Sequence, residues 1–201
     1  MQKGLLIVIS GPSGAGKGTI CKALTDDIKD IELSVSVTTR PPREKEIDGV
    51  NYLFTSVEDF ESRISKNDFL EHAKVYGNYY GTPKWKVLEA VEEGRDVILE
   101  IDIQGALKVK EEYPEGVFIF ILPPSLHELK KRITSRGTDS KEAIIKRMES
   151  TYEELSYAFK YDYAVLNDYV DHAVSKIKAI ILAEKNKANR QTGLINRIRE
   201  A

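Results

Sequence analysis

GPSGAGKGT occupies residues 11–19 of this chain, directly after the apolar run Leu5–Ile9 and at the start of Lys17–Asp30, a segment with helical spacing. Five consecutive apolar residues between Gly4 and Gly11 are typical of a strand that is buried on both faces of a parallel sheet. Strand, glycine-rich loop and helix in this order predict that the loop lies beyond the carboxyl end of a strand, where α/β proteins bind their ligands.

The loop nearly completes the phosphate-binding pattern G-x-x-x-x-G-K-[ST], and the strand and helix around it make the match specific. Glycines allow backbone N–H groups to converge on a phosphate, the helix N-terminus attracts anions, and a lysine adds a full charge. We therefore expect the phosphates of a nucleotide to be bound by Gly11, Pro12, Ser13, Gly14, Ala15, Gly16, Lys17, Gly18 and Thr19.

Gly18 departs from the pattern, because it stands where a hydroxyl is expected to bind a metal. Mg²⁺ usually keeps several waters, so we expect it to be held mainly by phosphate oxygens and water, with an acid nearby. Glu100 and Asp102 lie at the carboxyl end of a buried strand and are the acids best placed to hold those waters or to face an acceptor nucleotide. The alternative for either is a cap on the helix that starts near Ile103.

Further apolar runs predict more strands of the same sheet, at Val97–Asp102, Val117–Leu122 and Ala164–Leu166. Amphipathic segments predict helices between and after them, and these are Ile103–Tyr113, Ser125–Arg136, Ser140–Ala158 and Val170–Lys187, the last with a basic, frayed tail. The repeated order of strand and helix predicts an α/β fold, a three-layer phosphate-loop core built on a parallel sheet.

The region from Ser34 to about Gly94 differs from the rest, because Val50–Phe54 and Phe69–Val75 are short and partly alternating, with a helical stretch at Ser56–Lys66 between them. We expect a small α+β insertion at about 34–94, in a single domain whose core is 1–33 and 95–201. The polar, glycine-bearing stretch around Gly137 predicts a helical lid at about 134–150.

Composition restricts the partners. The 201 residues fit one compact domain, and 30 basic against 32 acidic residues leave a net charge of −2, which argues against a nucleic-acid binder. The single cysteine, Cys21, cannot form an internal disulfide, which favours a cytoplasmic protein. Leu5–Ile9 is too short for a signal core or a membrane span, so we expect no membrane attachment.

Arg40 and Arg43 flank a pair of prolines, whose rigidity would hold two guanidinium groups ready for one phosphate. Such a pair could instead be a solvated turn. Beside a phosphate loop the binding interpretation is favoured, because a kinase needs positive charge on its acceptor as well as on its donor.

Taken together, these motifs resemble the guanylate kinase family along the whole chain. The resemblance is carried, in this order, by GPSGAGKGT, SVSVTTRPPR, DGVNYLF, Phe69–Ala73, Gly77–Thr82, ILEIDIQGA and Lys130–Gly137. It implies a core parallel sheet, a monophosphate-binding insertion and a lid, and transfer of the γ-phosphoryl group of ATP to GMP with Mg²⁺. The products are ADP and GDP. Acceptance of dGMP stays open.

The resemblance also implies residue roles. The GMP phosphate would be bound by Arg40, Arg43, Tyr52 and Tyr80, and the guanine by Ser36, Glu71 and Thr82. A carboxylate suits guanine, which presents adjacent N1–H and N2–H₂ donors, whereas adenine offers a bare N1 acceptor. On the donor side, Lys17 would act on the transferring phosphoryl group together with a lid cluster of Arg132, Arg136 and Arg147, and Asn167 would contact adenine.

Two alternatives remain. Domains that resemble this family also serve as protein-interaction modules, typically with an eroded ATP loop, whereas Lys17 and the loop glycines are intact here. A kinase for another nucleotide, such as AMP or UMP, would keep the mechanism and change only the acceptor pocket.

Overall fold

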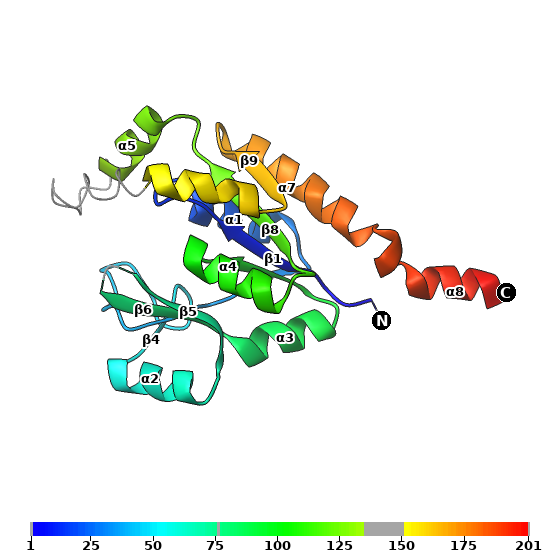
Figure 1. The fold of residues 1–201 in the computed structure, drawn as a ribbon, viewed down its shortest axis with the longest axis horizontal. Coiled ribbons are helices and arrows are strands. Elements are labelled where there is room, and N and C mark those ends of the chain that lie inside the picture. The colour runs from blue at the N-terminus through cyan, green and yellow to red at the C-terminus, as the bar shows by residue number, and fades with distance from the viewer. Residues whose placement is uncertain (1, 76, 135–150, 201) are drawn as a thin grey trace.

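A computed structural model describes residues 2–75, 77–134 and 151–200 of the chain. Its central feature is a five-stranded sheet, ordered β2-β7-β1-β8-β9, in which every neighbouring pair is parallel (Figure 1). The strands are β1 (Leu6–Ser10), β2 (Ile31–Leu33), β7 (Asp96–Glu100), β8 (Val117–Leu122) and β9 (Tyr163–Leu166). The predicted parallel α/β core is confirmed.

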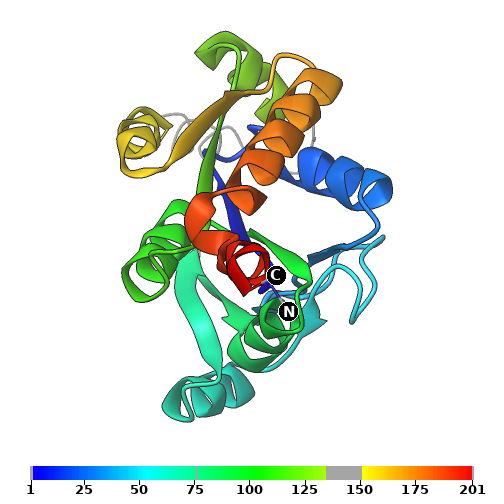
Figure 2. The same cartoon turned by 90° about the vertical axis from the view of Figure 1, so that its right-hand side faces the viewer.

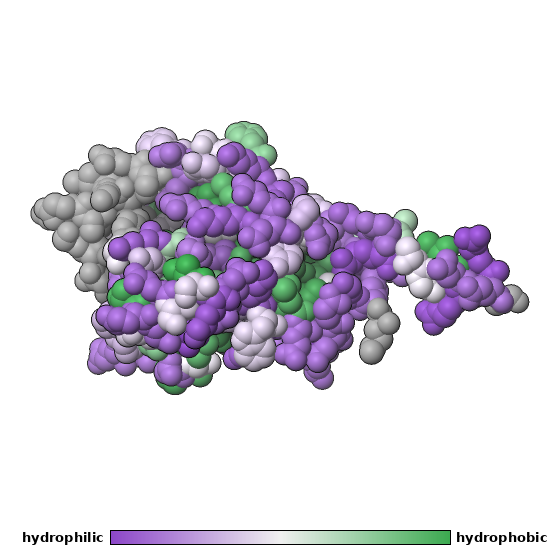
Figure 3. All heavy atoms as spheres, turned by 60° about the horizontal axis from the view of Figure 1, so that its bottom comes forward, coloured by the Kyte–Doolittle hydropathy of each residue, from purple (hydrophilic) through white to green (hydrophobic). Residues whose placement is uncertain are grey.

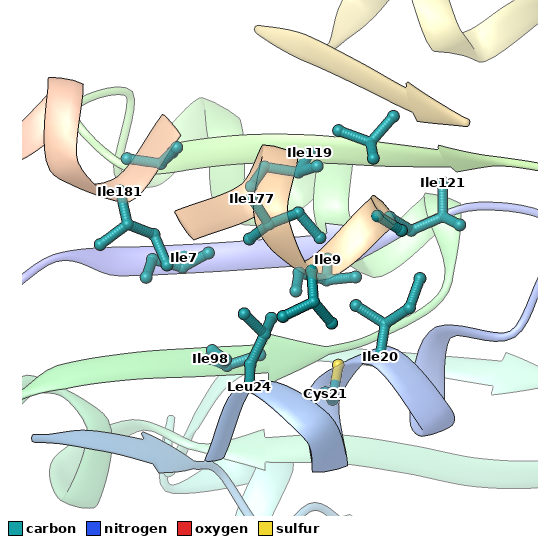
Figure 4. Packing of buried hydrophobic residues seen from close by; sticks show 14 of the residues in the cluster. Ile7, Ile9, Ile20, Cys21, Leu24, Ile98, Ile119, Ile121, Ile177 and Ile181 are labelled. Atoms are coloured by element: carbon teal, nitrogen blue, oxygen red, sulfur yellow. The ribbon is translucent and has the colours of Figure 1, made fainter. Parts of the chain in front are cut away.

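Alternate residues of these strands face opposite sides of the sheet, and each side has its own apolar cluster. Ile7 and Ile9 pack with Ile20 and Ile177 on one side, as Figure 4 shows, whereas Leu6 and Val8 belong to the cluster on the other side. A continuous apolar run therefore serves two cores at once, which is why β1 is buried along its whole length.

Helices cover both faces and complete the three layers (Figure 2). The first cluster lies under α1 (Lys17–Asp27) and α7 (Val170–Lys185), and the second under α3 (Lys84–Glu92) and α4 (Ile103–Glu112). After β8 the chain forms α5 (Leu126–Thr134), and residues 151–156 are helical before a 3-10 turn, η1 (Tyr157–Lys160).

A second, four-stranded sheet lies beside the core, in the order β4-β3-β6-β5. It consists of β3 (Val37–Thr38), β4 (Leu53–Phe54), β5 (Phe69–Val75) and β6 (Asn78–Pro83), with α2 (Val57–Ser65) packed against it. Its small core stacks the Phe60 ring on the rings of Phe69 and Tyr79, at centroid distances of 4.4 and 5.2 Å. Tyr79 is thus a packing residue of this small core.

The structure differs from the expected boundaries at two places in this region. The strand expected at Val50–Phe54 is shorter, because only Leu53–Phe54 pairs along β3. The segment predicted as the insertion, about 34–94, includes α3, whose Val87 and Ala90 pack in the cluster of the central sheet. α3 therefore packs with the core. The division of the chain into a core and an insertion stays a prediction.

The C-terminal tail is helical, which corrects the prediction of a frayed end. After η2 (Ala188–Arg190), α8 (Thr192–Glu200) extends away from the body of the protein (Figures 1 and 3). None of its residues is buried. Within the described ranges, no helix has the length and apolar character to cross a membrane.

Candidate functional site

The phosphate loop joins β1 to α1, and two of its glycines are needed for its shape. A Cβ on Gly11 would lie 2.5 Å from the carbonyl oxygen of Ile121 on β8. Gly16, the N-cap of α1, has a φ of +94° in the left-handed region that favours glycine. The glycines therefore allow the loop to run close against the neighbouring strand before the helix begins.

Lys17, the first residue of α1, is the loop's only cation. Its Nζ donates to the carbonyl oxygens of Gly11 and Pro12, at 2.7 and 3.2 Å. Burial lowers the pKa of Lys17, while the Glu100 carboxylate works against that shift. A cation held inside a glycine loop with a carboxylate nearby is suited to binding polyphosphate.

A cavity of about 510 Å³ opens between this loop and the second sheet. Residues from both sides line it, and those predicted from the sequence are Gly11, Ser13, Lys17, Ser36, Tyr52, Glu71, Tyr80, Glu100 and Asp102. The volume is in the usual range for a small-molecule site. The donor loop and most of the expected acceptor residues thus face one space.

Glu71 is the buried acid of this cavity, with 5% of its surface exposed. It lies on β5 opposite Thr82 on β6, and the Thr82 hydroxyl donates to Glu71 Oε1 at 2.7 Å. Burial raises the pKa of Glu71 to about 7, although the Thr82 hydrogen bond opposes the rise. The buried carboxylate needs donors, which a guanine edge can supply.

The Tyr52 and Tyr80 rings form a second group on the acceptor side, with centroids 6.0 Å apart. Arg40 lies over the Tyr52 ring at 5.5 Å, and its Nη2 donates to both carboxylate oxygens of Glu46 at 2.8 Å. The Arg43 side chain is 64% exposed and 3.9 Å from Glu46. Arg40 is therefore held within the group, whereas Arg43 reaches into solvent.

Asp102 caps α4, since its Oδ1 accepts from the backbone N–H groups of Gln104 and Gly105 at 2.7 and 3.0 Å. The capping alternative is thus the observed contact of Asp102, although the residue also lines the cavity. Glu100 is the acid beside the loop, because a Cβ on Gly18 would lie 3.4 Å from both of its carboxylate oxygens. Of the two acids expected near the phosphates, Glu100 is the one that lies beside Gly18.

Asn167, which was expected to contact adenine, contacts the phosphate loop. It is 3% exposed, and its Nδ2 donates to the carbonyl oxygen of Ala15 at 2.7 Å. A Cβ on Gly16 would lie 2.4 Å from the same nitrogen. The Asn167 amide therefore fastens the phosphate loop to the end of β9, and Arg132 Nη2 lies 3.4 Å from the Asn167 carbonyl oxygen.

Two members of the expected lid cluster, Arg136 and Arg147, lie outside the described residues, as does most of the predicted lid at about 134–150. The described residues contain no group of three or more His, Cys, Asp or Glu side chains that could hold a metal ion.

Several site residues escaped the sequence analysis. Glu46 forms an ion pair with Arg40. The only sign of this pair in the sequence is an acidic residue six positions after the arginine of the proline turn. Tyr157 lines the cavity and belongs to none of the motifs above, whereas Gln104 lies within the ILEIDIQGA motif but was given no role. Gly105 contacts Glu71 from another element, and only the three-dimensional structure reveals that contact.

Comparison with known proteins agrees with this geometry. The family profile described as guanylate kinase matches residues 3–184. The chain is 64% identical to a guanylate kinase of Caldanaerobacter subterraneus subsp. tengcongensis over 99% of this chain and 97% of that protein. It is 62% identical to one of Clostridium acetobutylicum over 94% and 90% of the two chains.

Among solved structures, it is similar to the crystal structure of guanylate kinase from Anaplasma phagocytophilum. The TM-score is 0.82 and the identity 34%, and the match covers 98% of this chain and 94% of that one. The chain belongs to the guanylate kinase family.

Proposed function

We propose that this protein transfers the γ-phosphoryl group of ATP to GMP, giving ADP and GDP. One observation carries the proposal: an intact phosphate loop and a buried carboxylate with the chemistry to bind guanine face the same cavity. Family membership gives the expectation of a nucleotide kinase, and the cavity supplies the two kinds of recognition that the reaction needs.

On the donor side, Lys17 and the loop amides bind the β- and γ-phosphates of ATP. Lys17 Nζ is already at the loop, donating to two of its carbonyl oxygens. Phosphate oxygens are better acceptors for an ammonium group than neutral carbonyls are. The charge then meets the negative charge that develops on the transferring group, where it lowers the barrier.

On the acceptor side, Tyr52, Tyr80, Arg40 and Arg43 bind the GMP phosphate. The guanidinium of Arg40 has five N–H donors, so it can contact a phosphate and still pair with Glu46. Arg43 extends into solvent and can approach an incoming anion. Phenol donors and two permanent cations suit a dianion.

The guanine base is read by Glu71, with Thr82 and Ser36 beside it. The carboxylate accepts from N1–H and N2–H₂ of guanine, while Thr82 keeps one carboxylate oxygen in place. Adenine has no N1–H, so it would leave a buried carboxylate without its partner, at a cost of about 1–3 kcal/mol. This difference favours GMP over AMP.

Phosphoryl transfer then proceeds directly, by in-line attack of a GMP phosphate oxygen. A loose transition state requires positioning and positive charge, so no general base or covalent enzyme intermediate is needed. His72, His127 and His172 accordingly have no part in the reaction. Arg132 lies beside the loop, where it can add positive charge to the donor phosphates.

Mg²⁺ fits this site as an ion carried by ATP. Gly18 has no oxygen to offer, and Glu100 is the carboxylate beside the loop, where it can accept from metal-bound waters. When bound, the ion neutralises charge on the β- and γ-phosphate oxygens. We place the reaction in the cytoplasm, in keeping with the single buried, unpaired cysteine, Cys21.

The proposal is tested by an ADP-release assay with ATP and Mg²⁺, offering GMP, AMP, CMP and UMP separately. Turnover with GMP far above the other three is expected, and it should disappear with EDTA. Turnover that favours AMP or a pyrimidine nucleotide would refute the acceptor assignment. Folded protein that binds GMP without any turnover would refute the kinase assignment and favour the interaction module.

A further inference from the structure

The carboxylate of Glu71 lies against the first turn of α4, at Gly105. A Cβ built on Gly105 would be 2.5 Å from Glu71 Oε2 and 3.0 Å from Glu71 Cδ. A Cβ atom does not approach an oxygen of a distant residue this closely. The carboxylate can therefore occupy its position only because residue 105 has no side chain.

The backbone gives no other reason for glycine here. Gly105 is inside a helix, and it is not among the residues with positive φ in the described chain. Glycine in a helix costs about 1 kcal/mol relative to alanine. Glycine is thus unfavourable for the helix at position 105, but the space that it leaves is filled by the Glu71 carboxylate.

Neither partner can move away easily. The Gly105 N–H donates to Asp102 Oδ1, which fixes the first turn of α4. Glu71 Oε1 is held by the Thr82 hydroxyl, and Leu70 next to it is buried in the core cluster that α4 also joins. A methyl group at residue 105 would consequently displace the carboxylate rather than the helix or the strand.

We propose that Gly105 is a positioning residue for the acceptor base: by leaving this space, it sets where the Glu71 carboxylate lies and thereby which purine the cavity accepts. The inference rests on the proposed function, because it takes Glu71 as the reader of guanine. Gly105 lies against Oε2 of Glu71, whereas Thr82 holds Oε1.

The test is Gly105→Ala, with Gly193→Ala as its matched control. Gly193 is also in a helix, α8, and a Cβ there would meet nothing within 4 Å. Dissociation constants for GMP and ADP are measured by calorimetry, and melting temperatures by circular dichroism. For Gly105→Ala we expect GMP affinity to fall roughly 10- to 100-fold, because the hydrogen bonds to the carboxylate are misplaced. ADP affinity and melting temperature should not fall.

A double-mutant cycle separates displacement of Glu71 from damage to the helix. In a Glu71→Ala background there is no carboxylate to displace, so adding Gly105→Ala should change GMP affinity little. The proposal is overturned if Gly105→Ala binds GMP like the wild type. It is also overturned if Gly105→Ala lowers GMP affinity by the same factor in the Glu71→Ala background as in the wild type. A loss of ADP affinity as large as the loss of GMP affinity would overturn it too.

This test measures nucleotide binding and not turnover, so its outcome is independent of the test of the proposed function. Wild-type protein that binds GMP without phosphorylating it would refute the kinase activity, and the Gly105 comparison would still decide the role of that residue. Wild-type protein that does not bind GMP would overturn both.

Discussion

The two sides of the cavity are built in different ways. The donor side is centred on one continuous stretch, residues 11–19, which joins a fully buried strand to a helix. The acceptor side gathers Ser36, Tyr52, Glu71 and Tyr80 from separate segments of the second sheet, and Asp102 from the start of α4. A phosphate is recognised by backbone and charge, which a local motif can supply, whereas a base needs polar groups brought together by the fold.

This contrast predicts that a donor-side change affects the chemical step, and the largest effect is expected at Lys17. Lys17→Ala should lower kcat roughly 100- to 1,000-fold, because it removes charge that acts on the transition state. GMP affinity should be unchanged. Lys22→Ala, an exposed lysine of the same helix, is the control. Equal losses in kcat and in GMP affinity, measured by steady-state kinetics and calorimetry, would contradict the donor role.

An acceptor-side change should alter base choice instead. Glu71→Gln keeps the shape but places a donor where guanine also donates, so kcat/KM for GMP should fall about 10- to 100-fold. ATP binding should persist. Glu58→Gln, at an exposed position on α2, controls for the loss of one charge. If Glu71→Gln lowers kcat/KM for GMP and for AMP by the same factor, Glu71 supports the fold and does not recognise the base.

Asn167 tests whether the donor side depends on any distant element. Asn167→Ala removes the hydrogen bond to Ala15, so KM for ATP should rise roughly 5- to 30-fold, with a similar rise for GTP as donor. Asn186→Ala is the matched control, since the Asn186 amide also donates to a backbone carbonyl at 2.7 Å, in an exposed position. A rise for ATP alone would instead identify Asn167 as an adenine reader.

The smallest expected effect is a pH dependence confined to the acceptor side. With the pKa of Glu71 at about 7, GMP affinity should fall roughly tenfold from pH 8 to pH 6, as the carboxylate that accepts from guanine becomes protonated. The GMP phosphate also titrates in this range, so Glu71→Gln serves as the reference. Identical pH profiles of GMP affinity for the two proteins would contradict the assignment.

The same raised pKa affects the stability of the ligand-free protein in the opposite direction with pH. A carboxyl whose folded-state pKa lies above its usual 4.5 contributes stability at low pH, which is lost as the pH rises from about 4.5 to about 7. GMP binding and ligand-free stability should therefore respond to pH in opposite directions.

What the sequence could predict follows the same division. Leu5–Ile9 and the loop after it predicted the central strand, the parallel sheet and the position of the donor site, because buried parallel strands are visible as apolar runs. The resemblance named the acceptor residues. It could not show that Glu46 pairs with Arg40, since that ion pair depends on how a turn folds back.

The remaining differences arise from long-range contacts. Asn167 meets the phosphate loop across 152 positions of sequence, and Gly105 meets Glu71 from another element. The sequence favoured Asp102 beside the nucleotide over a helix cap, and its two hydrogen bonds to α4 became visible only in the structure. β2 was missed because a three-residue strand with two exposed positions has no apolar run.

The most direct test of the account compares kcat/KM for GMP, IMP and AMP with the wild-type protein. IMP keeps the N1–H of guanine but lacks the exocyclic amine, and AMP lacks the N1–H. Two hydrogen bonds to Glu71 predict the order GMP, IMP, AMP, with each loss costing roughly tenfold or more. Equal values for GMP and IMP, or a preference for AMP, would contradict the claim that the buried carboxylate of Glu71 selects the acceptor.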